Sequence, residues 1–310
     1  MPTQTFSSFD AYSAAVQQAN VRAIFLGPQR TNWALSYLTM NNLSVQWGQD
    51  GGANIFQGSV DPGGVMIFMA TQNSHAGRGN GRQFDPSSLM VLTADDEFCI
   101  AATGWNRWFS VFVPNELLSD LNITSPASVG LSSSFIQLES IRAERFQSVM
   151  VQLGSIVQRI PVAFDSSAAL KTTERKLAET VREALGGHRE LTHPPGRHAV
   201  PRSQIIRMAM NCVDERADEY LLVEDLAIAA GVSERTLRTA FREYFGVGPV
   251  RYLRRRILEQ TRQALRGADP SVTTVAEIAT RFGVWEFGRF AQDYRLLYGE
   301  LPSETLHHPH

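Results

Sequence analysis

Two segments near the C-terminal end of this 310-residue chain repeat one pattern of residues. The first copy spans residues 223–249 and the second spans residues 275–302. Matching positions lie 52 residues apart at the shared glycine (Gly231 and Gly283) and 53 apart afterwards, because the second copy has one extra residue in its turn. Both copies close with an aromatic residue, a glycine and, three residues later, a proline. The repeat therefore predicts two small units of similar structure.

Each copy has the sequence of a helix-turn-helix. A short first helix would bury Leu226 or Ile278 beside an alanine, whose small side chain lets two helices pack closely. The shared glycine can supply the positive φ that a sharp turn needs. In the first copy Ser233 is a suitable N-cap for the second helix, whose polar face is left free to enter a major groove. An ordinary helical hairpin would also fit one copy, but two copies in register favour paired helix-turn-helix units.

The segment between the two copies, residues 249–266, predicts one continuous helix. A helix of this length is ~25 Å long, so it can hold two recognition helices about one DNA turn (~34 Å) apart on the same face of a duplex. Its three adjacent arginines, Arg254 to Arg256, are expected to contact phosphates or form surface salt bridges rather than contact bases. Its apolar side would comprise Tyr252, Ile257, Thr261 and Leu265.

From about residue 205 to 306, roughly the last third of the chain, the sequence resembles the DNA-binding domain of the AraC/XylS family of transcription regulators. The most specific match is the run from Gly283 to Arg295, followed by Tyr298-Gly299 and Pro302-Ser303. The resemblance implies two helix-turn-helix units joined by a long helix. It also implies an N-terminal cupin-like β-barrel with helices, which serves effector binding and dimerisation.

The predicted DNA contacts of the first unit lie early in its second helix. Alignment with the family motif puts base contacts on Arg235, Arg238 and Thr239, with Arg242 one turn further on. An arginine can bind O6 and N7 of guanine with two hydrogen bonds. Some of these arginines could instead contact only phosphate or pair with Glu234 or Glu243.

The second unit is poorer in hydrogen-bonding groups at the matching positions, which include Phe287, Arg289 and Gln292. Gln292 replaces an arginine that is common in the family, and Phe287 could touch a thymine methyl group or simply pack. We therefore expect Arg289 and Gln292 to contact DNA, but with less discrimination between bases than in the first unit.

The N-terminal part predicts strands followed by helices. Helical spacing links Phe135 to Val157, and a second helix is expected over about residues 166–185. The fold class is therefore α+β, with a cupin-like β-barrel and helices over residues 1–186, a linker over residues 187–203 and an all-α domain over residues 204–310. Short strands of a sandwich or small barrel are expected at residues 21–26, 33–40, 43–47, 55–60, 65–69, 89–92 and 108–113.

The composition argues against several other classes of protein. No apolar run reaches the ~20 residues that span a bilayer, and the N-terminus lacks a secretory signal, so we expect a cytoplasmic protein with no membrane partner. Cys99 and Cys212 form no zinc spacing, and His75 is the single histidine before the linker, so no metal is expected. No catalytic motif is present, which predicts a protein that is not an enzyme and has no cofactor.

The net charge of −2 does not by itself favour a nucleic-acid partner. Lys171 and Lys176 are the only lysines, however, and the remaining basic side chains are arginines, whose planar forks suit phosphate and guanine. A GC-rich genome would explain the same excess of arginine.

One glycine-rich loop, residues 71–83, carries Arg78 and Arg82 four positions apart. Arginine forks beside glycines suit a phosphate or carboxylate ligand, so both are candidate effector-binding residues. The spacing also resembles the arginine motif of cyclic-di-GMP receptors, although on an unrelated scaffold. A mobile surface loop is the alternative interpretation. The tryptophans of this domain could line an apolar pocket or fill the barrel core.

The sequence as a whole predicts a sequence-specific transcription regulator, most simply a ligand-responsive activator, that binds promoter or operator DNA as a homodimer. Its effector would be a small molecule, with anions and cyclic dinucleotides among the candidates. The alternatives are a regulator of the same family that responds to a cyclic dinucleotide, an enzyme with a fused DNA-binding domain, and a non-specific DNA-bending protein.

Overall fold

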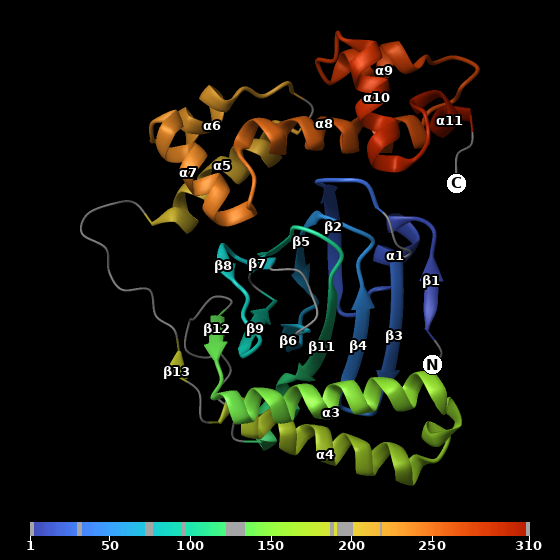
Figure 1. Ribbon diagram of the computed structural model, residues 1–310, viewed down its shortest axis with the longest axis vertical. Coiled ribbons are helices and arrows are strands. Elements are labelled where there is room, and N and C mark those ends of the chain that lie inside the picture. The colour runs from blue at the N-terminus through green and yellow to red at the C-terminus, as the bar shows by residue number, and fades with distance from the viewer. Residues whose placement is uncertain are drawn as a thin grey trace.

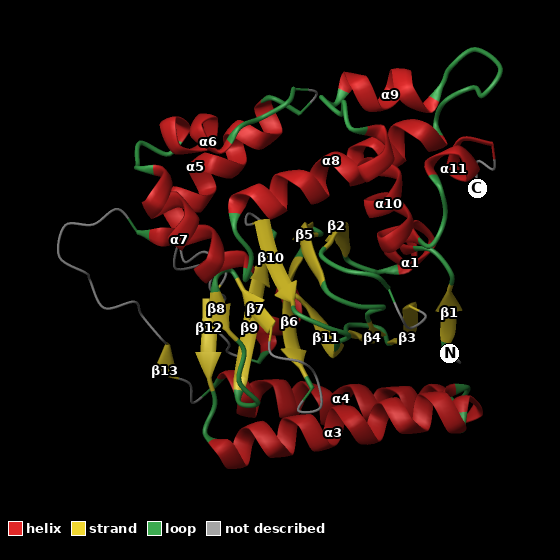
Figure 2. Cartoon of the chain, turned by 45° about the horizontal axis from the view of Figure 1, so that its top comes forward, coloured by secondary structure: helices red, strands yellow, loops and turns green. Residues whose placement is uncertain are grey.

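The structure is a computed structural model. It describes residues 3–29, 33–71, 77–94, 97–121, 134–186, 189–190, 201–217 and 219–307. The chain is arranged in layers, with a pair of long helices on one side, β-sheets in the middle and the C-terminal helices on the other side (Figures 1 and 2). Among the described residues, no helix combines the length and the apolar character needed to cross a membrane.

The N-terminal part contains two sheets, and every pair of neighbouring strands among the described residues is antiparallel. The larger sheet has the order β1 (Gln4–Phe6), β3 (Trp33–Thr39), β4 (Ser44–Gln49), β11 (Arg107–Pro114), β6 (Gly64–Ala70), β9 (Ser88–Thr93), β12 (Ser134–Gln137) and β13 (Arg189–Glu190). The smaller has the order β2 (Ala19–Phe25), β5 (Asn54–Val60), β10 (Glu97–Ala102), β7 (Gly77–Gly79) and β8 (Arg82–Gln83).

Successive side chains of a strand point to opposite faces of its sheet, so neighbouring residues pack against different parts of the molecule. In β10, Phe98 and Ile100 belong to an apolar cluster that includes residues of the larger sheet, whereas Cys99 and Ala101 belong to a cluster formed with the C-terminal helices between residues 205 and 253. Both faces of the smaller sheet are therefore buried, and the C-terminal domain covers its outer face. Burial raises the pKa of the Cys99 thiol far above its ordinary value.

The outer face of the larger sheet is covered by α3 (Ser140–Arg159) and α4 (Ser167–Leu185), which are joined by a short 3-10 helix, η2 (Pro161–Phe164). Phe146 packs on Phe109 with ring centroids 5.8 Å apart. Trp47 donates its indole N–H to the carbonyl of Met150 at 2.9 Å. Two shorter helices, α1 (Phe9–Ala15) and α2 (Asn115–Asp120), complete this part of the chain.

The C-terminal domain is entirely helical within the described residues. It contacts the smaller sheet through Tyr252, whose hydroxyl donates to Gln57, and through an ion pair between Arg22 and Asp214 at 3.2 Å. Its helices are α5 (Arg202–Glu215), α6 (Val223–Ala229), α7 (Glu234–Phe245), α8 (Pro249–Arg266), α9 (Val275–Arg281), α10 (Phe287–Tyr298) and α11 (Pro302–His307).

The predicted α+β class, with a β-rich part followed by an all-α part, is confirmed. The β-rich part consists of two sheets rather than one closed barrel. Most of the predicted linker lies outside the described residues, and α5 begins at Arg202, inside the predicted linker range.

The structure differs from the sequence analysis at three places in the N-terminal part. Phe135 belongs to β12, and the helix begins only at Ser140, because apolar spacing alone does not separate a buried strand from the first turn of a helix. The strand β10 was missed, although its residues are nearly all buried. The described part of the arginine loop, residues 77–83, forms a hairpin instead of a mobile loop; His75 lies outside the described residues.

Candidate DNA interface

The first helix-turn-helix consists of α6 and α7, as predicted. Gly231 has a φ of 64° at the turn, and the Ser233 side chain accepts a hydrogen bond from the backbone N–H of Thr236 at 3.3 Å. A cap of this kind is worth about 1 kcal/mol to a helix. Leu237 and Phe241 are fully buried and hold α7 in the core, so the opposite side of α7 faces solvent.

The second unit, α9 and α10, has the same construction with the extra residue in its turn. Thr274 and Glu277 form a capping box at the start of α9. Gly283 has a φ of 75°, and a Cβ there would lie 2.4 Å from the ring of Tyr220, so glycine is required for both conformation and space. Tyr294 is fully buried and holds α10 in place.

The predicted contact residues of the first unit lie on the accessible side of α7. Arg235 and Arg242 are exposed. Arg238 is partly buried and forms an ion pair with Glu234 at 2.6 Å, one of the pairings that the sequence left open. The Thr239 hydroxyl donates to the carbonyl of Arg235 at 3.0 Å. A DNA contact by Arg238 stays a prediction, and in the free protein this side chain is paired with Glu234.

The accessible side of α10 is more apolar. Arg289 and Gln292 are exposed, and Arg289 lies 3.8 Å from Glu286. Phe287 is 41% exposed, which leaves its ring available for contact. Trp285, in the turn before α10, is 75% exposed and was not singled out from the sequence. The exposure of this large indole at the start of a recognition helix depends on the fold, so the sequence alone could not single out Trp285.

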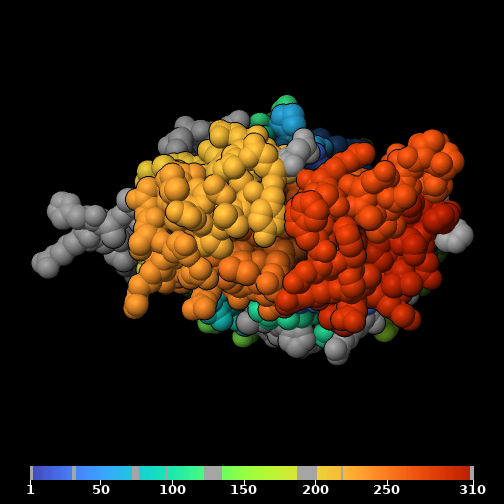
Figure 3. All heavy atoms as spheres, turned by 90° about the horizontal axis from the view of Figure 1, so that it is seen from above, coloured from blue at the N-terminus to red at the C-terminus, as the bar shows by residue number. Residues whose placement is uncertain are grey.

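Arginines from three helices meet in one groove between the two units. Its volume is about 440 Å³, and it is lined by Arg238 and Arg242 of α7, Arg251, Arg254 and Arg255 of α8, and Arg289 and Asp293 of α10, together with the first turn of α8. Figure 3, a view from above, shows the first unit in yellow and orange beside the second unit in orange and red. Because side chains of both recognition helices line this groove, both units present residues that the sequence predicts to contact DNA on the same side of the domain.

The helix α8 has the predicted bounds, but its apolar side was only partly predicted. Tyr252, Thr261 and Leu265 are buried, whereas Ile257 is only partly so. Arg256 was expected at the surface and is instead buried. It donates hydrogen bonds to the backbone carbonyls of residues 213 and 217, where α5 ends, at 2.9 and 2.8 Å. This arginine therefore joins α8 to the end of α5.

The helical domain matches known proteins. A family model described as a helix-turn-helix domain covers residues 226–308. A transcriptional activator of the XylDLEGF operon from Pseudomonas putida is 28% identical over 244 residues, which span 74% of this chain and 70% of that protein. A probable thc operon regulatory protein from Rhodococcus erythropolis is 37% identical over 102 residues, 33% of this chain and 31% of that protein.

These similarities show a C-terminal helix-turn-helix domain like that of the AraC/XylS transcriptional activators. Among solved structures, the match to the AraC-like transcriptional activator CuxR covers 90% of this chain and 98% of the CuxR chain, with 13% sequence identity and a TM-score of 0.44. The assignment does not depend on that weak structural likeness. The family resemblance predicted from the C-terminal residues is therefore confirmed.

In this chain the two loop arginines both have protein partners. Arg78 donates to the backbone carbonyl of Glu243, near the end of α7, at 2.9 Å. The guanidinium of Arg82 lies 5.5 Å from the ring centroid of Phe135. An effector-binding role for Arg78 and Arg82 stays a prediction, and such an effector would have to displace or extend these contacts.

The hairpin that carries these arginines contacts the first recognition helix directly. Its turn is Asn80-Gly81, both with positive φ, which is the favoured sequence of a two-residue hairpin turn and the signal that could have predicted it. A Cβ on Gly81 would lie 2.6 Å from the ring of Tyr244 in α7. The Asn80 side chain accepts from the N–H of Cys99 at 2.7 Å. The β7–β8 hairpin is therefore part of the interface between the domains.

Proposed function

We propose that this protein is an effector-responsive transcription activator whose α7 and α10 contact two successive major grooves of promoter DNA. The observation that supports this most directly is the arginine-lined groove, to which both recognition helices contribute. At 1.5 Å per residue, the 18 residues of α8 measure about 27 Å, close to the ~34 Å between successive major grooves. Modest bending of the duplex would bring both grooves onto the protein.

The DNA-binding part of the proposal is tested by selection of binding sites. Full-length protein would be incubated with a randomised duplex library, and the recovered sequences would be compared with those in the library. We expect two preferred blocks about 10 base pairs apart, one for each recognition helix. Recovery of unselected sequences would contradict sequence-specific regulation and favour the non-specific DNA-bending alternative.

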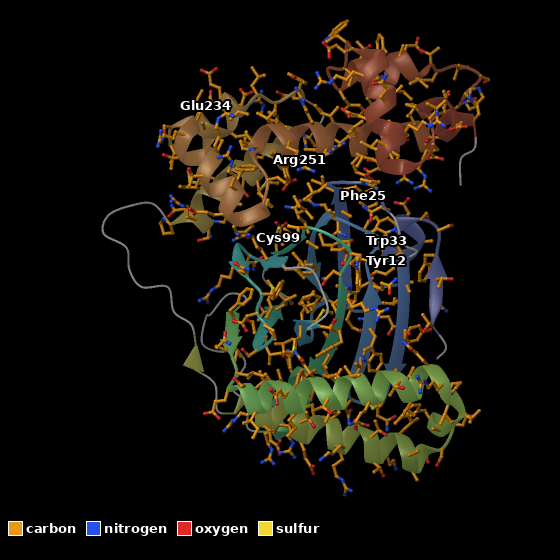
Figure 4. All side chains as sticks on the ribbon, viewed as in Figure 1. Tyr12, Phe25, Trp33, Cys99, Glu234 and Arg251 are labelled. Atoms are coloured by element: carbon orange, nitrogen blue, oxygen red, sulfur yellow. The ribbon has the colours of Figure 1, made fainter. Side chains whose placement is uncertain are left out.

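Response to an effector is supported by a cavity between the N-terminal domain and the second unit. Its volume is about 260 Å³, and Arg262 contributes a charged group to its lining. Phe25 lies 5.8 Å from Tyr298, a contact that crosses the domain interface. In Figure 4, Phe25 and Trp33 lie beneath the C-terminal half of α8. The aromatic lining residues are Phe6, Phe9, Phe25, Trp33 and Tyr298.

The chemistry of this cavity suits a small apolar acid. The Arg262 side chain is 8% exposed, and its Nε has no hydrogen-bond partner among the described residues. Its guanidinium lies 4.8 Å from the ring centroid of Tyr298 and its Nη1 lies 3.6 Å from the Asp10 carboxylate. A ligand carboxylate could bind this guanidinium while its apolar part contacts the aromatic rings. Because both domains line the cavity, such a ligand would change how they pack.

The effector proposal can be tested by thermal unfolding of the full-length protein with 1-naphthoate and octanoate. A ligand that binds the folded state raises Tm by mass action. We expect a rise with either acid, a smaller rise with the uncharged 1-naphthamide, and loss of the difference in Arg262→Met. Equal shifts with the acids and the amide would exclude a carboxylate-binding role for Arg262, and no shift with any of them would exclude this cavity as a site for such acids.

We further propose that the protein acts as a cytoplasmic homodimer. Large apolar side chains on and after α3 are exposed, among them Ile141, Val151, Ile160 and Val162. A second copy would cover this surface. Sedimentation of the full-length protein tests this, since Val151→Glu should shift a dimer toward the monomer.

A further inference from the structure

The groove between the recognition helices contains a guanidinium that the free protein leaves partly unsatisfied. Arg255, on α8, has a buried Nη1 with no hydrogen-bond partner among the described residues. Burial lowers the pKa of Arg255; the charge of Asp293 opposes this, and the neighbouring Arg251 and Arg254 add to it. A buried, unpartnered N–H of a charged group is unfavourable for folding. Its retention in an accessible groove suggests a role in binding.

Two of the other arginines around the groove already have partners within the chain. Arg238 pairs with Glu234, and Arg251 donates to the carbonyl of Leu26 at 2.6 Å. Figure 4 shows Arg251 on the side of α8 that faces the N-terminal domain. Among the described residues that line the groove there are six arginines and one acidic residue, Asp293. The groove therefore has a strong excess of positive charge, to which the N-terminal end of α8 adds.

We propose that this groove is a phosphodiester clamp, in which Arg255 binds a backbone phosphate of the DNA strand that crosses between the two major grooves. The proposal rests on the proposed function, because it places the duplex against α7 and α10 together. A phosphate oxygen would accept the unpartnered N–H of Arg255, and the exposed Arg254 beside it would bind the same or the adjacent phosphate. Arg255 is a positioning residue: it holds the duplex while α7 and α10 contact the bases.

The same chemistry would suit a free phosphorylated molecule, and two observations favour DNA. The groove lies between the two helices that carry the predicted base contacts, Arg238 on α7 and Arg289 on α10. Its volume of about 440 Å³ is much larger than one phosphate group requires, whereas a strand of phosphodiesters would extend along it.

The test compares Arg255→Gln with Arg159→Gln in the full-length protein. Arg159 is exposed at the end of α3, in the helical layer on the opposite side of the molecule from the DNA-binding domain, so its variant makes the same chemical change far from the groove. Binding would be measured by fluorescence anisotropy at several salt concentrations. Two probes are used: a duplex selected from the randomised library and a mixed-sequence 30-base-pair duplex.

We expect Arg255→Gln to weaken binding to both duplexes by a similar factor, about 5- to 10-fold, and to reduce the slope of log K against log salt by about 0.9. Arg159→Gln should change neither quantity. Thermal unfolding of free Arg255→Gln should be unchanged or shifted upward, since the variant removes a buried charge. If that variant does not fold, Arg254→Gln, at an exposed position, should reduce the salt slope in the same way.

Three results would overturn the clamp. An unchanged salt slope would exclude a phosphate contact, and a loss confined to the selected duplex would make Arg255 a base-contacting residue. If inorganic phosphate or tripolyphosphate raised the Tm of the wild type but not of Arg255→Gln, while DNA binding stayed equal, the groove would be a site for free phosphate. If the proposed function itself is wrong, the wild type will show no preference between the two duplexes. That result is distinct from the three above.

Discussion

The two helix-turn-helix units have the same backbone design and different surfaces. The first exposes arginines on its recognition helix, with Arg235, Arg238 and Arg242 along one side of α7. The second exposes aromatic rings at the start of α10, Trp285 and Phe287, with few groups that can form hydrogen bonds to bases. The repeat therefore preserves the residues that form the fold, while the DNA-facing residues differ. We infer that base recognition depends mainly on the first unit.

The two units also differ on the side that faces the N-terminal domain. The first is contacted by the β7–β8 hairpin, through a hydrogen bond from Arg78 to the end of α7 and the close approach of Gly81 to Tyr244. The second lies over the aromatic cavity that contains Arg262. A ligand in that cavity would act first on the second unit, and the hairpin would fix the first unit in place.

The largest expected effect distinguishes the two recognition helices. Arg238→Ala should weaken binding to the selected duplex about 100-fold, because a two-bond contact to guanine is worth ~1–3 kcal/mol and the variant also leaves Glu234 facing the DNA. Gln292→Ala should weaken binding to the same duplex by less than about 5-fold. Mobility shift with both variants measures the ratio, and equal losses would contradict the assignment of base recognition to the first unit.

The next effect concerns a buried titratable group of the N-terminal domain, Asp50. Asp50 accepts hydrogen bonds from Tyr12 at 3.3 Å and from Trp108 at 3.1 Å, and burial raises the pKa of Asp50 to about 7. The folded protein therefore holds a proton that the unfolded chain releases near its ordinary pKa of 3.8. The free energy of unfolding should fall as pH rises from about 4 to 7 and then stay level.

Replacement of this carboxyl group tests that pH dependence. Between pH 5 and pH 8 the wild type should lose about 2 kcal/mol more stability than Asp50→Asn, since each pH unit is worth at most ~1.4 kcal/mol. Urea denaturation at the two pH values measures the difference. Parallel losses in the two proteins would show that Asp50 is ionised in the folded state.

The hairpin that contacts the first unit provides a smaller effect. Gly81→Ala should lower the free energy of unfolding by about 1–2 kcal/mol, because the position has a φ of 81° and the new Cβ would meet Tyr244. Gly63→Ala is the matched control, since Gly63 has a φ of 102° and nothing lies within 4 Å of its ideal Cβ. Equal destabilisation would show that backbone strain, and not the contact with α7, explains the loss.

The smallest effect concerns the partner of Arg238. Glu234→Gln should strengthen DNA binding about 2- to 3-fold, because it removes a negative charge from the DNA-facing side and frees the arginine. Figure 4 shows Glu234 at the outer end of the first unit, away from the N-terminal domain, so the change should leave the domain interface intact. Weaker binding by this variant would mean that Glu234 itself contacts DNA or orients Arg238.

The C-terminal domain was predictable from sequence because its signals are local. Each turn needs a glycine with positive φ, and Ser233 caps α7 by accepting from the N–H of Thr236, three residues along the chain. The extra residue in the second copy lengthens only its turn. Even the bounds of α8 follow from Pro249 and Gly267 at its ends. The turn glycines, the helix cap and the ends of α8 can all be recognised from the sequence alone.

The rest of the molecule depends on contacts between distant residues. Nothing near Arg256 in the chain indicates that it would be buried against the end of α5, or that Arg78 would contact the carbonyl of Glu243, 165 residues away. The arginine groove likewise forms only when α7, α8 and α10 pack together. Each predicted DNA contact therefore depends on the sequence of a single helix. The contacts of the loop arginine Arg78, in contrast, depend on how the two domains pack.

Guanine methylation interference on the selected duplex tests most directly whether both recognition helices contact one DNA molecule. Methylation at N7 blocks major-groove contacts. The account predicts two clusters of interference about one helical turn apart for each bound monomer, the first lost in Arg238→Ala and the second weakened in Arg289→Ala. A single cluster, or two clusters that both depend on Arg238 alone, would contradict the claim that α7 and α10 contact successive major grooves.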